Sequence, residues 1–100
     1  MKIVYICHPI SGDIEGNLKS IRNIVRYINI SYPDVIPFVP YYADIVSMDE
    51  LWVFGDRVSC GMQGEIDLAK EAGIIIKQAW IVPDPRLEIP VESLMLKEWI

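Results

Sequence analysis

The spacing of apolar residues changes along the chain, and this change predicts strands that alternate with helices. Apolar side chains run almost without interruption through residues 2–7 and again through residues 50–54. Such continuous runs are typical of strands that are buried on both faces of a parallel sheet. After the first run, apolar residues recur at steps of three and four, which is the pattern of one helical face: Ile14, Leu18, Ile21, Ile24, Val25 and Ile28.

The remaining segments extend this alternation. Residues 29–34 are predicted as a turn, because Pro33 follows the helical pattern. The other expected elements are a strand over 35–39, in which Pro37 indicates an edge position or irregular pairing, a loop or short helix over 40–48, a helix over 62–72 closed by Gly73, a strand that starts at 74 and ends at 76 or 82, and a short helix over 91–100.

This order predicts one domain over residues 1–100 with an α/β fold. The expected architecture is a three-layer α/β/α arrangement with a small parallel sheet, of the flavodoxin or Rossmann type. Ligands of such folds bind beyond the carboxyl ends of the strands. The loops that follow the first and third expected strands, at residues 8–12 and 56–61, are therefore the candidate binding segments.

Composition and charge narrow the classes of function. Hydrophobic residues make up 52% of the 100 residues, which is enough for a core and argues against disorder. The net charge is −5 and the basic residues are scattered, so a polymeric nucleic acid is not an expected partner. Neither a membrane-spanning run nor a signal peptide is evident, which favours the cytoplasm. No metal or other cofactor is implied, because His8 is the only histidine and the two cysteines lack ligand spacing.

Each candidate loop has an ordinary and a functional interpretation. The first loop precedes a helix whose amino-terminal amides can hold an anion, although it lacks the glycines and lysine of a nucleotide-binding loop. The alternative is that this loop is an ordinary turn from strand to helix. The second loop, Ser59-Cys60-Gly61-Met62-Gln63-Gly64-Glu65, also suits an oxyanion. Glu65 is expected in or near the first turn of the helix that follows, where the helix dipole keeps a carboxylate ionised. The alternative is that this charge only stabilises the helix and has no functional role.

Three segments resemble one protein family. They are Tyr5-Ile6-Cys7-His8-Pro9-Ile10-Ser11-Gly12, the run from Asp49 to Gly55, and the pattern Ser59-x-Gly-Met-x-x-Glu65. Together they are similar to the nucleoside 2-deoxyribosyltransferase-like superfamily, and within it to the 2'-deoxynucleoside 5'-monophosphate N-glycosidases and their small phage and bacterial relatives. The resemblance covers roughly residues 2–77, and its last segment is the most specific.

The resemblance implies chemistry at an N-glycosidic bond. It makes Glu65 the nucleophile that attacks the anomeric carbon, and Tyr5 the residue that orients it. Ser59, with the amides near Gly61 and Met62, would bind the 5'-phosphate or 5'-hydroxyl of a nucleoside or nucleotide. The sugar and base would lie against the first loop, and a base would stack on a tyrosine of the central segment. These residues are Cys7, His8, Pro9, Ile10, Ser11, Gly12 and Tyr41.

One departure from the family leaves the activity open. The glycosidases carry a second carboxylate where this chain has Tyr41, and the stretch before Asp49 looks shortened. Asp44 is the nearest candidate for a general acid, whereas Asp49 is better explained as the start of a strand. The alternatives are therefore an enzyme, a protein of the same fold that binds a nucleotide without cleaving it, and an assembly subunit without a ligand. A homodimer or larger homo-oligomer is expected from the relatives and from the apolar residues near the end of the sequence.

Overall fold

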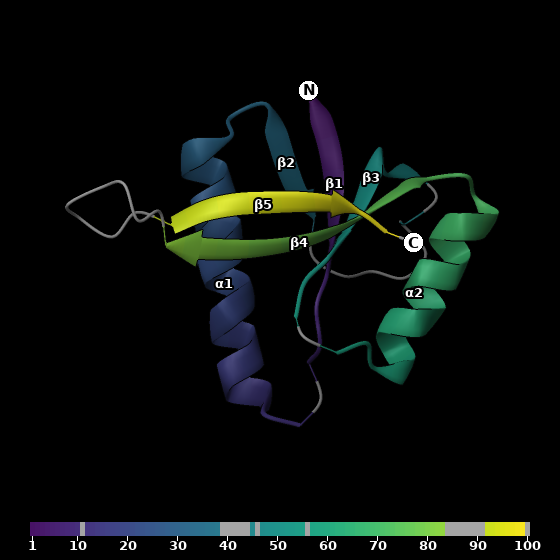
Figure 1. Cartoon of the computed structure of the whole chain (residues 1–100), viewed down its shortest axis with the longest axis horizontal. Coiled ribbons are helices and arrows are strands. Elements are labelled where there is room, and N and C mark those ends of the chain that lie inside the picture. Colours follow the sequence, from purple (N-terminus) through teal and green to yellow (C-terminus); the bar gives the residue numbers. More distant parts are fainter. Residues whose placement is uncertain (11, 39–44, 46, 56, 84–91, 100) are drawn as a thin grey trace.

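A computed structural model describes residues 1–10, 12–38, 45, 47–55, 57–83 and 92–99 (Figure 1). Its elements follow the predicted order as far as the fourth strand. They are β1 (Lys2–Cys7), α1 (Ile14–Ser31), β2 (Val35–Phe38), β3 (Glu50–Val53), α2 (Cys60–Glu71), β4 (Ile75–Pro83) and β5 (Glu92–Glu98).

The five strands form one mixed sheet in the order β2-β1-β3-β4-β5. The first four strands are parallel, as predicted, and Tyr5 lies opposite both Phe38 and Leu51. β2 is at the edge of the sheet, which confirms the interpretation of Pro37. Because β1 and β3 are central neighbours with connections that leave in opposite directions along the sheet, the strand order reverses between them.

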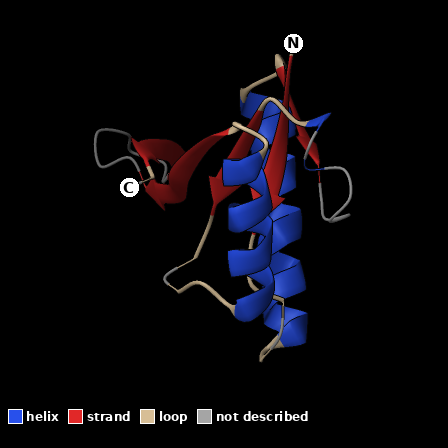
Figure 2. Ribbon diagram, turned by 90° about the vertical axis from the view of Figure 1, so that its right-hand side faces the viewer, coloured by secondary structure: helices blue, strands red, loops and turns tan. Residues whose placement is uncertain are grey.

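The segment over 91–100 was expected to be a helix, and this prediction is wrong. Residues Glu92–Glu98 form β5, which pairs antiparallel with β4. The reason lies in the length of β4. Its pairing with β3 ends at Gln78, yet the strand continues to Pro83, and β5 pairs with it from Lys77 through Pro83. Figure 2 shows the β4–β5 pair reaching away from the two helices.

Two apolar clusters form the core, one on each face of the sheet. Val4 and Ile6 of β1 belong to a cluster with Ile24 and Ile28 of α1. The alternate residues of the same strand, Tyr5 and Cys7, belong to a second cluster, which includes Met62, Ile66 and Ala69 of α2. Since successive side chains of a strand point to opposite faces, α1 and α2 cover opposite faces of the sheet.

Asp13 fixes the start of α1, and the structure corrects two expectations for this helix. Asp13 begins α1, because its Oδ1 accepts a hydrogen bond from the Gly16 amide at 3.0 Å. The helix continues to Ser31, so the turn predicted from residue 29 starts later: Pro33 disfavours helix only next to itself. Ile14 and Leu18 were expected on the buried face, but they are 57% and 44% exposed. None of the helices described here is long and apolar enough to span a membrane.

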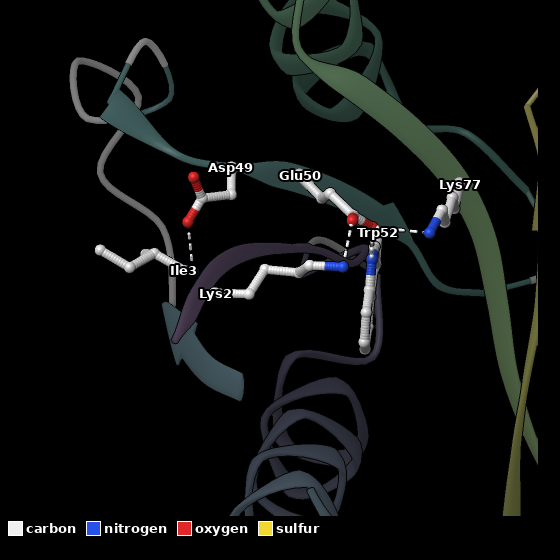
Figure 3. A network of polar contacts seen from close by, with 6 residues as sticks. All are labelled: Lys2, Ile3, Asp49, Glu50, Trp52 and Lys77. Atoms are coloured by element: carbon white, nitrogen blue, oxygen red, sulfur yellow. Dashed lines mark hydrogen bonds and ion pairs between the residues drawn. The ribbon is translucent and has the colours of Figure 1, made fainter. Parts of the chain in front are cut away.

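The amino ends of the strands are joined by a buried ion-pair network around Glu50 (Figure 3). Its Oε2 lies 2.6 Å from Nζ of Lys2, and its Oε1 lies 3.0 Å from Nζ of Lys77. The indole nitrogen of Trp52 donates to Oε1 at 2.9 Å. The residue is only 4% exposed. The network therefore links β1, β3 and β4 on the face that α1 covers.

Candidate functional site

The two candidate loops meet at the carboxyl ends of β1 and β3. The Phe54 amide donates to the Cys7 carbonyl at 2.8 Å, which holds the strand ends together. Gly55 has a φ of +98°, and a Cβ at this position would lie 3.2 Å from Cδ of Pro9. A glycine is therefore needed here both for its backbone conformation and for the close approach of the first loop. This arrangement confirms that both loops lie at the same end of the sheet, next to the carboxyl ends of its strands.

A cavity of about 350 Å³ lies between the loops and the start of α2. All but one of its lining residues belong to the set selected from the sequence, and they come from both candidate loops and from α2. The lining residues are His8, Ile10, Ile14, Ser59, Gly61, Met62 and Glu65. The exception is Ile14, whose exposed side chain at the start of α1 was assigned to the core by its spacing. The cavity is large enough for a small-molecule ligand.

Glu65 is the ionisable group of this cavity. It lies in the second turn of α2 and is half-buried. The Cys7 thiol approaches it from β1, with Sγ 3.9 Å from Oε1 of Glu65 and 4.0 Å from the Met62 carbonyl oxygen. The Tyr5 hydroxyl, also supplied by β1, interacts with the same carboxylate. Glu65 therefore has one side toward the cavity and another against two donors from the central strand.

The environment raises the pKa of Glu65 above its usual value. Burial is the largest cause, and hydrogen bonds from Tyr5 and Cys7 oppose it only in part. This shift is opposite in direction to the one expected from the helix dipole. Because α2 begins at Cys60, Glu65 lies beyond the first turn, where the dipole has weakened. Burial, followed by the charge of Glu65, also raises the pKa of Cys7, so its thiol is a neutral donor and not a nucleophile.

His8 is held firmly on the side of α1. Its Nδ1 lies 2.7 Å from the Pro9 carbonyl oxygen and its Nε2 lies 3.0 Å from Oγ of Ser20. A carbonyl only accepts, so Nδ1 carries a hydrogen and donates it to Pro9. The His8 ring therefore contributes to the wall of the cavity with both nitrogens already engaged.

Two residues of α1 that sequence reasoning missed hold the first loop. Ser20 binds His8, and Nδ2 of Asn17 donates to the Ile10 carbonyl at 3.1 Å. They are three residues apart, a spacing that places them on the same side of a helix. The sequence signal that could have identified Asn17 and Ser20 is this spacing of two polar residues close to the first candidate loop.

Ser59 and Met62 have a more structural role than predicted. Oγ of Ser59 accepts a hydrogen bond from the Met62 amide at 3.2 Å and so begins α2. The Met62 amide is thus engaged and does not serve a phosphate in this arrangement. The Ser59 hydroxyl keeps its own hydrogen for donation. Ser59 and Gly61 remain the residues of this loop that can meet a polar ligand group.

The other selected residues lie beside the cavity or outside the described part of the chain. Pro9 packs next to Gly55, Cys7 is buried behind Glu65, and Gly12 lies beside the guanidinium of Arg57. A Cβ on Gly12 would be 3.1 Å from Nη2 of Arg57, so a cation that the sequence analysis did not select stands at the edge of the first loop. Ser11, Tyr41 and Asp44 lie outside the described residues.

Asp49 has the structural role that its position suggested. Its Oδ2 accepts from the Ile3 amide at 2.7 Å, and its own amide donates to the Ile3 carbonyl at 2.9 Å (Figure 3). These bonds fix the amino end of β3 against β1, at the end of the sheet opposite to the cavity. Among the residues described, no group of three histidine, cysteine or acidic side chains is placed to hold a metal ion.

Comparison with known proteins adds one partial match. A family described as a domain of unknown function (DUF7768) matches residues 43–79. The matched stretch includes β3, α2 and the whole parallel part of β4, and so contains the segment from Ser59 to Glu65. No curated protein matches the chain.

Proposed function

We propose that this protein cleaves or transfers the N-glycosidic bond of a deoxynucleoside or a deoxynucleoside 5'-monophosphate. The observation that carries the proposal is the placement of Glu65. Its carboxyl group lines a ligand-sized cavity together with residues from both loops at the carboxyl ends of β1 and β3. The resemblance of the segments around Tyr5 and Glu65 to the deoxyribosyltransferase-like superfamily supplies the reaction class.

In the proposed reaction, the Glu65 carboxylate attacks the anomeric carbon of the sugar. The bond between that carbon and the base nitrogen breaks, and its electron pair leaves with the base. A glycosyl ester with Glu65 results, which water hydrolyses or a second base displaces. The attack requires the charged carboxylate. Hydrogen bonds from Tyr5 and Cys7 favour that form against the effect of burial.

The surrounding residues suggest where the rest of the substrate binds. Ser59 and Gly61 are proposed to take the 5'-group, and Arg57 supplies the positive charge that a 5'-phosphate needs near the first loop. Tyr41 remains the proposed stacking residue and Asp44 the proposed acid for the leaving base. The proposal includes a three-layer, flavodoxin-like arrangement of the fold, a cytoplasmic location and a homodimer or larger homo-oligomer.

A nucleotide-binding protein without catalysis is the second candidate. The direction of the Glu65 pKa shift favours it, because burial disfavours the charged carboxylate that the attack on carbon requires. In that case the same cavity would hold the nucleotide without cleaving it.

The two candidates are separated by measuring base release and binding on the same samples. Wild type, Glu65→Gln and the exposed-site control Glu71→Gln are incubated with deoxynucleosides and their 5'-monophosphates, and free base is measured by chromatography. The enzyme proposal expects release from wild type and Glu71→Gln, and a loss of about 10⁴-fold or more in Glu65→Gln. Adding a second base then distinguishes transfer from hydrolysis.

The opposite results are equally informative. Release that persists in Glu65→Gln contradicts the role of this residue. If no substrate is cleaved but a nucleotide raises the melting temperature of the wild type, the binding protein is the correct alternative. Absence of both release and binding across the panel overturns both proposals.

A further inference from the structure

A second cavity, of about 440 Å³, lies on the other side of His8. It is on the face of the sheet that α1 covers, and its residues come from the carboxyl ends of β1 and β3, from α1 and from β4. Six of its lining residues carry the argument: His8, Lys19, Ser20, Asn23, Phe54 and Trp80. Its position beside the point where the strand order reverses is one where α/β folds bind ligands.

The polar side of this cavity is built from neighbouring turns of α1. Lys19 and Asn23 are four residues apart and therefore lie on the same side of the helix. Lys2 and Lys77 both pair with Glu50, whereas Lys19 has no carboxylate within ion-pair distance in the described part of the chain. Lys19 is exposed, with Glu15 one turn before it on α1, so its ammonium supplies a solvent-facing positive charge in the lining of the cavity that an anionic group can meet.

The other side of the cavity is aromatic. Phe54 follows β3 and is buried, and Trp80 of β4 is 37% exposed although it is large and apolar. The exposed Trp80 has surface on which a planar ring can stack, whereas Phe54, which is 2% exposed and belongs to the core, can offer only an edge contact. The hydrogen bond between Ser20 and His8 fixes the wall between this cavity and the one at Glu65. The cavity therefore combines a cationic end, an apolar aromatic side and a rigid boundary.

We propose that this cavity binds a small aromatic anion: a planar ring against Phe54 and Trp80, with a carboxylate or similar group at Lys19 and Asn23. The site is distinct from the cavity at Glu65, and the proposal does not depend on N-glycosidic chemistry. The anionic group is held by charge-assisted hydrogen bonds, and the ring by burial of its apolar surface.

The test is a titration of the ¹⁵N-labelled full chain with 2-naphthoate, followed by nuclear magnetic resonance. The backbone amides of Gly16 and Gly55 and the indole of Trp80 report on the proposed site, because all three residues line it. The amides of Ser59 and Gly61 report on the other cavity. Saturable shifts confined to the first group are expected. The neutral isostere 2-naphthamide is expected to bind more weakly by about tenfold.

Two lysine variants supply the matched comparison. Lys19→Gln removes the charge and is expected to weaken naphthoate binding by about ten- to a hundredfold, while naphthamide binding stays unchanged. Lys70→Gln removes an exposed charge of α2 and is expected to change neither. The proposal is overturned if the amide binds as tightly as the carboxylate, if the shifts map to Ser59 and Gly61, or if naphthoate produces no saturable shifts. Since the amide comparison uses wild type, the result does not depend on how well a variant folds.

Discussion

A buried carboxylate, Glu50, and a half-buried one, Glu65, lie toward opposite ends of the sheet and differ in almost every neighbour. Glu50, at the amino end, is bonded to two ammonium groups and an indole (Figure 3). Glu65, at the carboxyl end, interacts with a thiol and a phenol, and no cation of the described residues lies within ion-pair distance of it. The charge of Glu50 is matched within the protein, whereas no described cation matches that of Glu65.

The pKa values of the two groups follow from this difference. Burial alone would raise the pKa of Glu50, but hydrogen bonds from Lys2, Trp52 and Lys77, with the charge of Lys77, lower it below its usual value. At Glu65 burial is stronger than the hydrogen bonds, and the pKa rises. The same residue type is thus a structural anion at one end of the sheet and an adjustable acid at the other.

The largest effect on stability is expected from Glu50→Gln. Removing the carboxylate leaves Lys2 and Lys77 without their shared partner, but their side chains are 45% and 28% exposed and can be solvated, so the free energy of unfolding should fall by about 2 kcal/mol. Urea unfolding at neutral pH measures it. The exposed-site variant Glu71→Gln should remain within about 0.5 kcal/mol of wild type. A loss at Glu50 no larger than at Glu71 would show that the network contributes nothing.

Glu65→Gln should have the opposite sign and a smaller size. The substitution removes a charge that is disfavoured by burial, so the free energy of unfolding at neutral pH should rise by about 1 kcal/mol. The same urea series measures it. The contrast with Glu50 fails if this variant is destabilised to a similar extent, because Glu65 would then be a structural anion too.

The pH dependence separates the two carboxylates further. The stability supplied by Glu50 is present above its unfolded pKa of 4.5 and is lost as the pH falls through its lower folded pKa. Glu65 has a folded pKa above 4.5, so its contribution is present below 4.5 and is lost as the pH rises through the folded value. The difference between wild type and Glu65→Gln should therefore appear over a higher pH range than the difference for Glu50→Gln. Unfolding curves collected from acid to neutral pH test this order, and overlapping ranges would contradict it.

The smallest effect is expected from Tyr5→Phe. Its hydroxyl lowers the pKa of Glu65, so its loss should raise that pKa further and move the acid limb of any base-release activity to higher pH. The pH profile of kcat/KM measures the shift. Tyr27→Phe, far from the cavity on α1, is the control. An unchanged profile for Tyr5→Phe would mean that the hydroxyl does not influence the ionisation of Glu65.

The fold was predictable where local pattern and tertiary structure agree. The continuous apolar run of Lys2–Cys7 gave the bounds of β1, and Pro37 gave the edge position of β2. The strand Glu92–Glu98 was missed because its cause is not local: β4 extends past β3 and offers a free edge to pair with. No periodicity within residues 91–100 contains that information.

The candidate site was predictable as a meeting of two loops, but its electrostatics were not. Glu65, Ser59 and His8 share a cavity, as the order of parallel strands required. The ionisation of Glu65 depends on how deeply α2 buries it against Tyr5 and Cys7, which are about sixty residues away in the sequence. The bond from His8 to Ser20 likewise needs the packing of α1 on the sheet.

The network around Glu50 also fixes the register in which the strands of the sheet pair. Side chains alternate between faces along a strand, so a shift of β3 by one residue would carry the Glu50 carboxylate to the opposite face. It would then lie among the apolar partners of Tyr5 and Leu51, without either ammonium group. Apolar residues such as Leu51 and Val53 can exchange one apolar neighbour for another at little cost in free energy. The Glu50 carboxylate cannot move among apolar neighbours without a large cost. The Glu50 carboxylate therefore meets its two ammonium partners in only one strand register. Electrostatics disfavours the shifted registers.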